Sequence, residues 1–268
     1  MDAYSQLGIS NDFMFGHIMA EPERCRVFLQ QILGFHIDRV ELIEKQFPLD
    51  EKADAHGIRL DIYVDDGKTV YNCEMQTSKP LTLPKRIRYY QSMIDINLLK
   101  KGENYENLKK SFVIFICTFD PFDRSRYIYS FENLCVEDNT LHLNDEALKI
   151  FVNTKGTVGS VSDEFKELMH FLDTSEIREY QNQLVNELAE ELTKARARDE
   201  WRNEWMSIEM LKHDARAEGK IEGKIEGKIE GKMETLISLV KDGLISIKEA
   251  SNRVQMTEQE FAECVSKA

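Results

Sequence analysis

Three polar side chains between residues 58 and 76 are spaced so that they could bind one metal ion and act on a phosphate. They are Asp61, Glu74 and Gln76, in the segment IRLDIYVDDGKTVYNCEMQ. A hard cation such as Mg²⁺ is held by one or two carboxylates together with waters and substrate phosphate oxygens. Such an ion polarises a phosphate and lowers the pKa of a bound water, which becomes the nucleophile. Asp61 and Glu74 are therefore candidate metal ligands. Gln76 could orient the water or donate to the phosphate, but it lacks the positive charge of a lysine.

The spacing of these residues depends on a predicted β-hairpin. Apolar and polar residues alternate on both sides of Asp66-Gly67, a dipeptide typical of two-residue hairpin turns. A turn centred there places Asp61 opposite Asn72 and diagonal to Glu74, with about 7–8 Å between the backbones of the acidic pair. The alternative is that this face is the solvated side of a half-buried hairpin, where a polar residue is expected at every second position.

A basic segment follows the hairpin. Residues 79–110 carry eight Lys and Arg against three Asp and Glu, whereas the whole chain has a formal net charge of −13. Local positive charge beside a carboxylate pair favours a confined phosphate-contacting surface over plain solvation. Pro84, followed by apolar residues at three- and four-residue steps, predicts an amphipathic helix over about 83–99. The predicted DNA-contacting side chains on this helix are Lys85, Arg86 and Arg88.

The composition is typical of a cytoplasmic protein with one main core. The chain has 268 residues, of which 42% are hydrophobic and 31% charged, enough for a domain plus an appendage. Because no apolar run reaches about 18 residues and the N-terminus MDAYSQLGIS lacks a signal-peptide pattern, we expect no membrane partner. Five scattered cysteines without a C-x-x-C pair predict reduced thiols. Six histidines show no zinc-ligand spacing.

Four motifs, in this order, resemble the bacterial PD-(D/E)XK nuclease family transposases, also called recombination-promoting nucleases. The motifs are NDFMF (11–15), LDIYV (60–64), YNCEMQ (71–76) and PKRIRYY (84–90). The resemblance extends over about residues 8–155. It implies a Mg²⁺-dependent DNA endonuclease on a restriction-endonuclease-like α/β core, with Mn²⁺ as the alternative ion.

The same resemblance assigns roles by match to the family motif. Asp61 and Glu74 would be the metal ligands, and Gln76 would occupy the position of the motif lysine; an E-x-Q motif in place of E-x-K is usual in this family. Asp12, in the opening motif, is a weaker candidate for a further acidic position. That motif departs from the family at Gly16, where a lysine is common.

The pattern along the chain predicts an α/β fold with a mixed sheet flanked by helices, followed by a long helix and a small C-terminal helical module. Besides the two arms of the hairpin, strands are expected at residues 40–47, 112–119, 127–131 and 147–152. The three expected domains are a nuclease-like domain (1–175), a long charged helix with EGKI repeats (176–233) and a helix-turn-helix-like module (234–268).

The C-terminal third is expected to be helical and to make a homo-oligomer. A helix over about 176–218 repeats leucine and tryptophan in a stripe too long for a small domain to bury alone, which implies a partner. The repeat EGKIEGKIEGKIEGKM at 218–233 stacks its isoleucines in one column and places in every turn a glycine that costs about 1 kcal/mol relative to alanine. It predicts either an adjustable spacer or a self-associating coiled coil. The last helix, TEQEFAECVSKA, is acidic, so the module would contact protein as readily as DNA.

These features predict a Mg²⁺-dependent DNA endonuclease that hydrolyses phosphodiester bonds and is linked to recombination or mobile elements. Two other functions stay open: a nucleic-acid-binding relative that has lost its metal, and an oligomerising scaffold whose long helix carries the function. The presence of both Asp61 and Glu74 at compatible positions favours the endonuclease.

Overall fold

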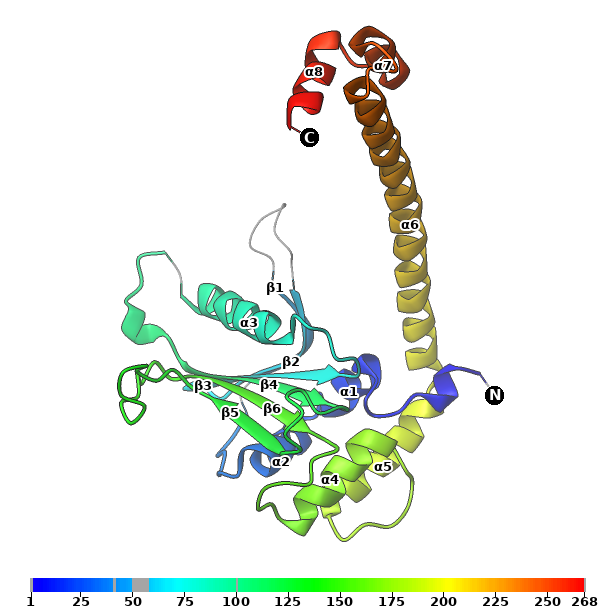
Figure 1. Cartoon of the computed structure of the whole chain (residues 1–268). Helices are drawn as coiled ribbons and strands as arrows, with labels where there is room; N and C mark the ends of the chain where they lie inside the picture. The colour runs from blue at the N-terminus through cyan, green and yellow to red at the C-terminus, as the bar shows by residue number, and fades with distance from the viewer. Residues whose placement is uncertain (1, 41, 50–57, 100, 268) are drawn as a thin grey trace. The chain divides into compact units, whose positions relative to one another are not determined.

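The computed structural model describes residues 2–40, 42–49, 58–99 and 101–267 (Figure 1). The chain divides into two compact units, Met1–Arg202 and Asn203–Ala268. The first unit is built around a β-sheet and contains the predicted site, and the second is helical.

A six-stranded mixed sheet forms the centre of the first unit, with the strand order β1-β2-β3-β4-β6-β5. The strands are β1 (Leu42–Leu49), β2 (Ile58–Asp65), β3 (Thr69–Gln76), β4 (Lys110–Cys117), β5 (Ile128–Phe131) and β6 (Ala147–Asn153). The β3–β4 and β4–β6 pairs are parallel, and the β1–β2, β2–β3 and β5–β6 pairs are antiparallel. The predicted mixed sheet is therefore confirmed, and each predicted strand is present with its ends shifted by a few residues.

Helices cover both faces of this sheet (Figure 1). The helices of the first unit are α1 (Asp12–Met19), α2 (Pro22–Leu33), α3 (Leu83–Leu98), α4 (Asp163–Thr174), α5 (Gln183–Arg196) and the start of α6 (Asp199–Lys241). α3 lies on one face, and α2, α4 and α5 lie on the other. This arrangement confirms the predicted restriction-endonuclease-like α/β class.

The centre of the sheet is apolar on both faces. β4 reads KSFVIFIC, and every residue after Lys110 is buried. Parallel strands covered by helices on both sides are expected to be apolar in this way. On the side of α3, Val113 and Phe115 pack with Ile87, Tyr90 and other apolar residues of that helix. The core thus fixes where α3 lies over β3 and β4.

The hairpin that carries the acidic residues is present, but the predicted pairing of its strands is wrong. The strands pair as Ile62↔Cys73, Tyr63↔Asn72, Val64↔Tyr71 and Asp65↔Val70. Asn72 therefore lies opposite Tyr63 and not opposite Asp61. The shift is two residues, so it keeps every side chain on its predicted face. It brings Asp61 and Glu74 closer together than the predicted diagonal.

The turn explains this shift. Its central residues are Gly67 and Lys68, because the N–H of Asp66 donates to the carbonyl of Thr69 at 3.0 Å. Gly67 has a φ of 92°, the positive φ that the first central position of such a turn requires. The Asp66 carboxylate accepts hydrogen bonds from the N–H groups of Lys68 and Thr69, a bonding pattern typical of aspartate at a turn. Asp66 thus follows the last residue of β2 and is the first of the four turn residues, not one of the two central ones.

The long helix predicted over 176–218 is also wrong. The structure has two helices, α5 and α6, separated at Ala197 and Arg198, and Asp199 begins α6 where a carboxylate suits the helix N-terminus. The α5 stripe consists of Leu184, Val185, Leu188, Ala189, Leu192 and Ala195, all buried. Since α5 packs against α1, α2 and α4, the first unit itself is the partner that this stripe requires.

The second unit contains most of α6 and a small helical module at the end of that helix. Its core contains Leu236, Ala250 and Phe261, one from each of α6, α7 (Ile247–Val254) and α8 (Glu258–Lys267). Ser246 and Glu249 form a capping box at α7, and Thr257 and Glu260 form a second one at α8. Short, well-capped helices therefore stabilise a separate small core.

Two further sequence expectations bear on the described residues. All five cysteines are free thiols, as predicted. Within the described parts of the chain, no helix has the combination of length and apolarity that crossing a membrane requires.

Candidate active site

Asp61 and Glu74 lie side by side on neighbouring strands. The backbones of β2 and β3 pair as far as Ile62 and Cys73. Beyond this pair, hydrogen bonds from backbone N–H groups to the Asp61 and Glu74 side chains connect the two strands. One Glu74 carboxylate oxygen, Oε1, accepts from the N–H of Asp61 at 3.0 Å. The Asp61 oxygen Oδ2 accepts from the N–H of Met75 at 2.8 Å. Each carboxylate thus accepts a hydrogen bond from the backbone of the neighbouring strand, which holds the two carboxylates next to each other between β2 and β3.

The polar face of β3 is buried, which contradicts the alternative of a solvated face for this strand. The exposed fractions are 0% for Asn72, 2% for Glu74 and 6% for Gln76. The helix α3 lies over this side of the sheet, and its Tyr90 is itself 7% exposed. Buried carboxylates and amides are costly unless a partner or ligand compensates them. Their presence together indicates a functional site.

Burial dominates the electrostatics of Glu74. Removal from water holds the pKa of its carboxyl well above the ordinary value, and the charge of Asp61 raises that pKa further. The Asp61 N–H, the Asn72 amide and the Arg86 guanidinium act in the opposite direction and lower the pKa of Glu74. A divalent cation beside both carboxylates would relieve the repulsion between them.

This shift predicts how stability depends on pH. A carboxyl with a raised pKa binds its proton more tightly in the folded state than in the unfolded state, so the free energy of unfolding falls as pH rises. The fall begins near the ordinary Glu pKa of 4.5 and continues up to the raised value. Urea unfolding in EDTA, from about pH 5 to about pH 8, is expected to show wild type losing stability relative to Glu74→Gln. A stability difference that stays constant with pH would contradict the assigned shift.

Gln76, at the end of β3, is held from α3. The Nη1 of Arg86 donates to the Gln76 carbonyl Oε1 at 2.9 Å, and its Nη2 donates to the Tyr90 hydroxyl at 2.9 Å. The guanidinium carbon lies 5.5 Å from the centre of the Tyr90 ring and 5.8 Å from that of Phe115. The structure therefore brings Asp61, Glu74, Gln76 and Arg86 together from β2, β3 and α3.

The other predicted DNA-contacting residues lie apart from this cluster. Lys85 and Arg88 are exposed on α3. Two lysines of the basic segment are neutralised within the protein, Lys79 by Asp123 at 2.7 Å and Lys109 by Asp65 at 2.6 Å. The free positive surface is therefore smaller than the count of basic residues indicates.

Asp12 reaches the same end of β3 as the site. It is the first residue of α1 and lines a pocket of about 410 Å³ together with Met75 and Thr77. Met75 is next to Glu74 in β3, but neighbouring residues of a strand point to opposite faces, so this pocket alone does not place Asp12 beside the two carboxylates. The role of Asp12 as a further acidic position stays a prediction.

Asn72 and Tyr90 are functional candidates that the sequence did not single out. Asn72 lies two residues before Glu74 on the same face. Among the described residues, neither of its amide atoms has a partner with hydrogen-bond geometry, although the amide is close enough to lower the pKa of Glu74. A buried unsatisfied group costs about 1–3 kcal/mol. For Tyr90, the usable signal was its four-residue spacing from Arg86, which places both on one side of a helix.

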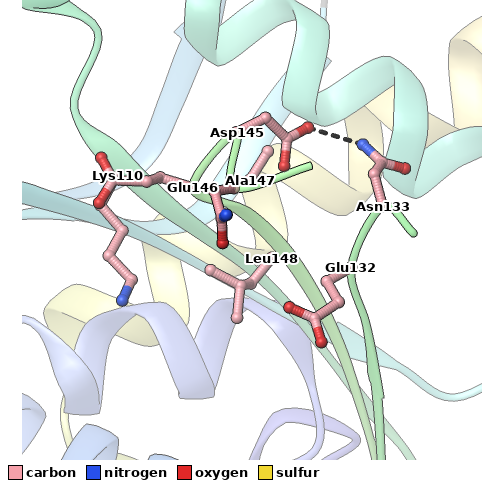
Figure 2. A pocket seen from close by; sticks show the side chains of 8 residues that line it. Lys110, Glu132, Asn133, Asp145, Glu146, Ala147 and Leu148 are labelled. Atoms are coloured by element: carbon pink, nitrogen blue, oxygen red, sulfur yellow. Dashed lines mark hydrogen bonds between the residues drawn. The ribbon is translucent and has the colours of Figure 1, made fainter. Parts of the chain in front are cut away.

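A second pocket lies at the opposite end of the strands (Figure 2). It has a volume of about 290 Å³ and is lined by the start of β4, at Lys110, and the start of β6. Its side chains include Glu132, Asp145 and Glu146, with a hydrogen bond from Asn133 to Asp145. It contains none of the predicted site residues. Three carboxylates against one lysine make it unsuited to a phosphate.

The donor set at Asp61 and Glu74 fits Mg²⁺ better than zinc. Across the described residues, no three His, Cys, Asp or Glu side chains converge as a set that could hold an ion. A zinc site normally needs three or four such ligands. Mg²⁺ keeps several waters and needs only one or two carboxylates plus substrate phosphate. The pair is therefore sufficient for Mg²⁺ or Mn²⁺.

Comparison with protein families adds a separate observation. The family model described as PD-(D/E)XK nuclease family transposase matches residues 9–200. The match extends beyond residue 155, where the resemblance was expected to end, and includes α4 and α5. Neither the curated proteins nor the solved structures gave a match. The matched range contains every strand and the whole candidate site.

Proposed function

This chain belongs to the PD-(D/E)XK nuclease family transposases, and from that membership we propose that it is a Mg²⁺-dependent DNA endonuclease that hydrolyses phosphodiester bonds. Mn²⁺ is expected to substitute, because both ions take oxygen ligands. The setting we propose is recombination or the activity of mobile elements. The protein would act in the cytoplasm, where the DNA that it cuts is present.

The observation that carries this proposal is the interlocked pair of carboxylates. Asp61 and Glu74 each accept a hydrogen bond from the strand of the other, and Glu74 is almost fully buried. Two carboxylates this close repel one another, and a cation bound between them would relieve that repulsion. The Asp61 N–H, the Asn72 amide and Arg86 offset part of this repulsion, and a bound cation would offset more of it, so the pair favours the endonuclease over the catalytically lapsed alternative.

Each residue of the site has a role in this proposal. Asp61 and Glu74 would hold the ion, which supplies polarisation of the scissile phosphate and a water of lowered pKa. The Asp61 N–H fixes the orientation of the Glu74 carboxylate. Gln76, buried at the end of β3, would orient the attacking water or donate to the phosphate. Lys85 and Arg88, exposed on α3, would contact the DNA backbone.

Plasmid cleavage by the purified full chain tests the proposal. Nicking or linearisation is expected with Mg²⁺ or Mn²⁺, and none is expected in EDTA or with Asp61→Ala and Glu74→Ala proteins that remain folded. Absence of cleavage by folded wild type across metals and DNA forms would reject the endonuclease. The same result would favour the binding and scaffold alternatives.

A truncation tests the scaffold alternative. A cut after residue 175 would remove α5, whose Leu184, Leu188 and Leu192 are buried in the first unit. A cut after Arg202, at the boundary between the two units, keeps that core. Cleavage retained by residues 1–202 would locate the activity in the first unit and contradict a scaffold carried by α6.

The exposed cations on α3 are expected to set DNA affinity. The double variant Lys85→Ala, Arg88→Ala should weaken binding to duplex DNA uniformly across sequences and reduce the slope of log K against log salt by about 2. Fluorescence anisotropy in EDTA measures this without cleavage. Lys166→Ala, at an exposed lysine of α4, is the matched control. An unchanged salt slope in the double variant would remove α3 from the DNA-binding surface.

We also propose that the C-terminal helices join copies of the chain. In the repeat region of α6, Ile221 and Ile229 are each 60% exposed, and a second copy of the helix could bury the apolar column to which they belong. The double variant Ile221→Glu, Ile229→Glu should convert an oligomer into a monomer in light scattering after size exclusion. Lys220→Ala with Lys228→Ala is the control. A wild type that is already monomeric would contradict this interface.

A further inference from the structure

Arg86 is held in place by four groups of the protein. It donates to the Gln76 carbonyl and to the Tyr90 hydroxyl, each at 2.9 Å. The rings of Tyr90 and Phe115 lie 5.5 and 5.8 Å from the guanidinium carbon, distances at which a cation is attracted to an aromatic ring. An arginine whose planar end is used in this way is positioned to act on a neighbour within the protein.

The chemistry of arginine decides how Gln76 is turned. A glutamine amide can flip, so it can present either its carbonyl oxygen or its N–H₂ group to a given neighbour. Arginine has donors and no acceptor, so only the carbonyl of Gln76 can face Arg86. Because the carbonyl faces Arg86, the N–H₂ group of Gln76 points away from Arg86, on the face of the sheet that Gln76 shares with Glu74. A hydrogen bond from a cation also polarises the amide and strengthens its N–H groups as donors.

The charge of Arg86 reaches the metal-binding pair as well. Glu74 lies two residues before Gln76 on β3, on the same face, and the Arg86 guanidinium lowers the pKa of the Glu74 carboxyl. Gln76 by itself has donors but no charge, whereas a lysine at this position would have both. In this protein the donors come from Gln76 and the positive charge comes from Arg86.

We propose that Arg86 is a positioning residue that acts through Gln76, by turning the Gln76 N–H groups toward the scissile phosphate and supplying behind them the positive charge that a lysine at position 76 would carry. This inference rests on the proposed endonuclease function. It differs from direct contact between Arg86 and the DNA backbone, the role expected from the sequence. Lys85 and Arg88, exposed on the same helix, are better placed for that contact.

The first test separates the two roles of Arg86 by kinetics. Arg86→Met removes the charge and both hydrogen bonds while keeping much of the volume between the two rings. Cleavage of a supercoiled plasmid with Mg²⁺ is expected to show kcat lowered by about 10²-fold and KM changed by less than about threefold. DNA affinity in EDTA is expected to stay within about threefold of wild type. Arg178→Met, at an arginine that also packs on a tyrosine ring but lies outside the site, is the matched control.

The second test is a rescue. Gln76→Lys in the wild-type background places a second cation against Arg86 and is expected to lower kcat by about tenfold or more. In the Arg86→Met background, the same Gln76→Lys change supplies charge and donors directly and is expected to raise kcat at least about tenfold above Arg86→Met alone. The lysine is therefore harmful with Arg86 present and beneficial without it. A merely structural role of Arg86 predicts no such reversal of sign.

The outcomes that overturn the inference are distinct from failure of the proposed function. No cleavage by wild type would reject the endonuclease, and this inference with it. A wild type that cleaves, with Arg86→Met equally active or with no gain from Gln76→Lys in that background, would reject the inference alone. Weaker DNA binding by Arg86→Met in EDTA, by about tenfold or more, would assign Arg86 to the DNA surface instead.

Folding is controlled in each variant by circular dichroism and thermal unfolding. If Arg86→Met does not fold, Arg86→Lys replaces it, because lysine keeps the charge but cannot bridge Gln76 and Tyr90 as a planar fork does. Its expected kcat lies between those of wild type and of a neutral variant, with DNA affinity in EDTA unchanged. Wild-type kcat in Arg86→Lys would show that the bridge to Gln76 is unnecessary and would overturn the inference.

Discussion

Replacing Glu74 by glutamine is expected to abolish metal-dependent cleavage while making the metal-free protein more stable. Glutamine keeps the shape of the side chain and an oxygen that can accept from the Asp61 N–H. It removes one of the two charges that would hold the ion. A loss of several kcal/mol of transition-state stabilisation corresponds to a rate lowered by about 10³-fold or more. Asp61→Asn is expected to lower the rate similarly.

The stability change has the opposite sign for a physical reason. Near neutral pH the buried Glu74 must either hold a proton or remain charged beside Asp61, and both cost free energy. Glutamine is neutral and binds no proton, so neither cost arises, and the free energy of unfolding in EDTA should rise by about 1–3 kcal/mol. Urea unfolding in EDTA measures it, alongside plasmid cleavage with Mg²⁺ by the same preparations.

Glu132→Gln is the control, because Glu132 is a half-exposed carboxylate at the other end of the strands. It should leave cleavage unchanged and shift stability by less than about 0.5 kcal/mol. If Glu74→Gln cleaved DNA as wild type does, the ion could not depend on Glu74. If Glu74→Gln were inactive and also less stable, the loss of activity would reflect damage to the fold.

The second large effect is expected on stability, from truncation of Phe115. This residue is 0% exposed in the central strand β4 and lies across from Glu74 and Phe151. Its ring packs edge-on against Tyr90 and Phe151, at 5.6 and 5.7 Å between ring centres. Phe115→Ala should lower the free energy of unfolding by about 3–5 kcal/mol through lost burial and the cavity left behind. For a domain of ordinary stability, about 5–15 kcal/mol, this is a large fraction.

The cavity would also lie under the site. Phe115 supports both Tyr90 and the Arg86 guanidinium, so its loss should lower the rate of cleavage even where the protein remains folded. Phe115→Leu keeps most of the volume and should cost much less. Tyr105→Ala, at a side chain that is 79% exposed, should cost less than about 0.5 kcal/mol. A loss below about 1 kcal/mol in Phe115→Ala would mean that the sheet repacks around the gap.

The local pattern of the sequence determined the elements and the faces of the strands. Alternation in the hairpin identified Asp61, Glu74 and Gln76 as sharing one face, and this survived the error in pairing because a shift of two residues preserves faces. The apolar run in β4 predicted a strand buried on both sides. The side chains of Asn11, Ser162 and Thr257 cap α1, α4 and α8, and each cap is a local feature because it involves only residues within one turn.

Tertiary structure decided what covers these elements and which partners their side chains find. The alternating pattern is the same for a face open to water and a face under a helix, so only the packing of α3 shows that Glu74 and Gln76 are buried. The stripe on α5 needed an apolar partner, but a stripe does not specify whether that partner is another chain or the domain itself. The contact between Arg86 and Gln76 joins residues of a helix and a strand. Charge and spacing along the sequence placed Arg86 only on a basic surface. The sequence pattern does not specify how α3 is rotated relative to β3, and that rotation decides whether Arg86 reaches Gln76.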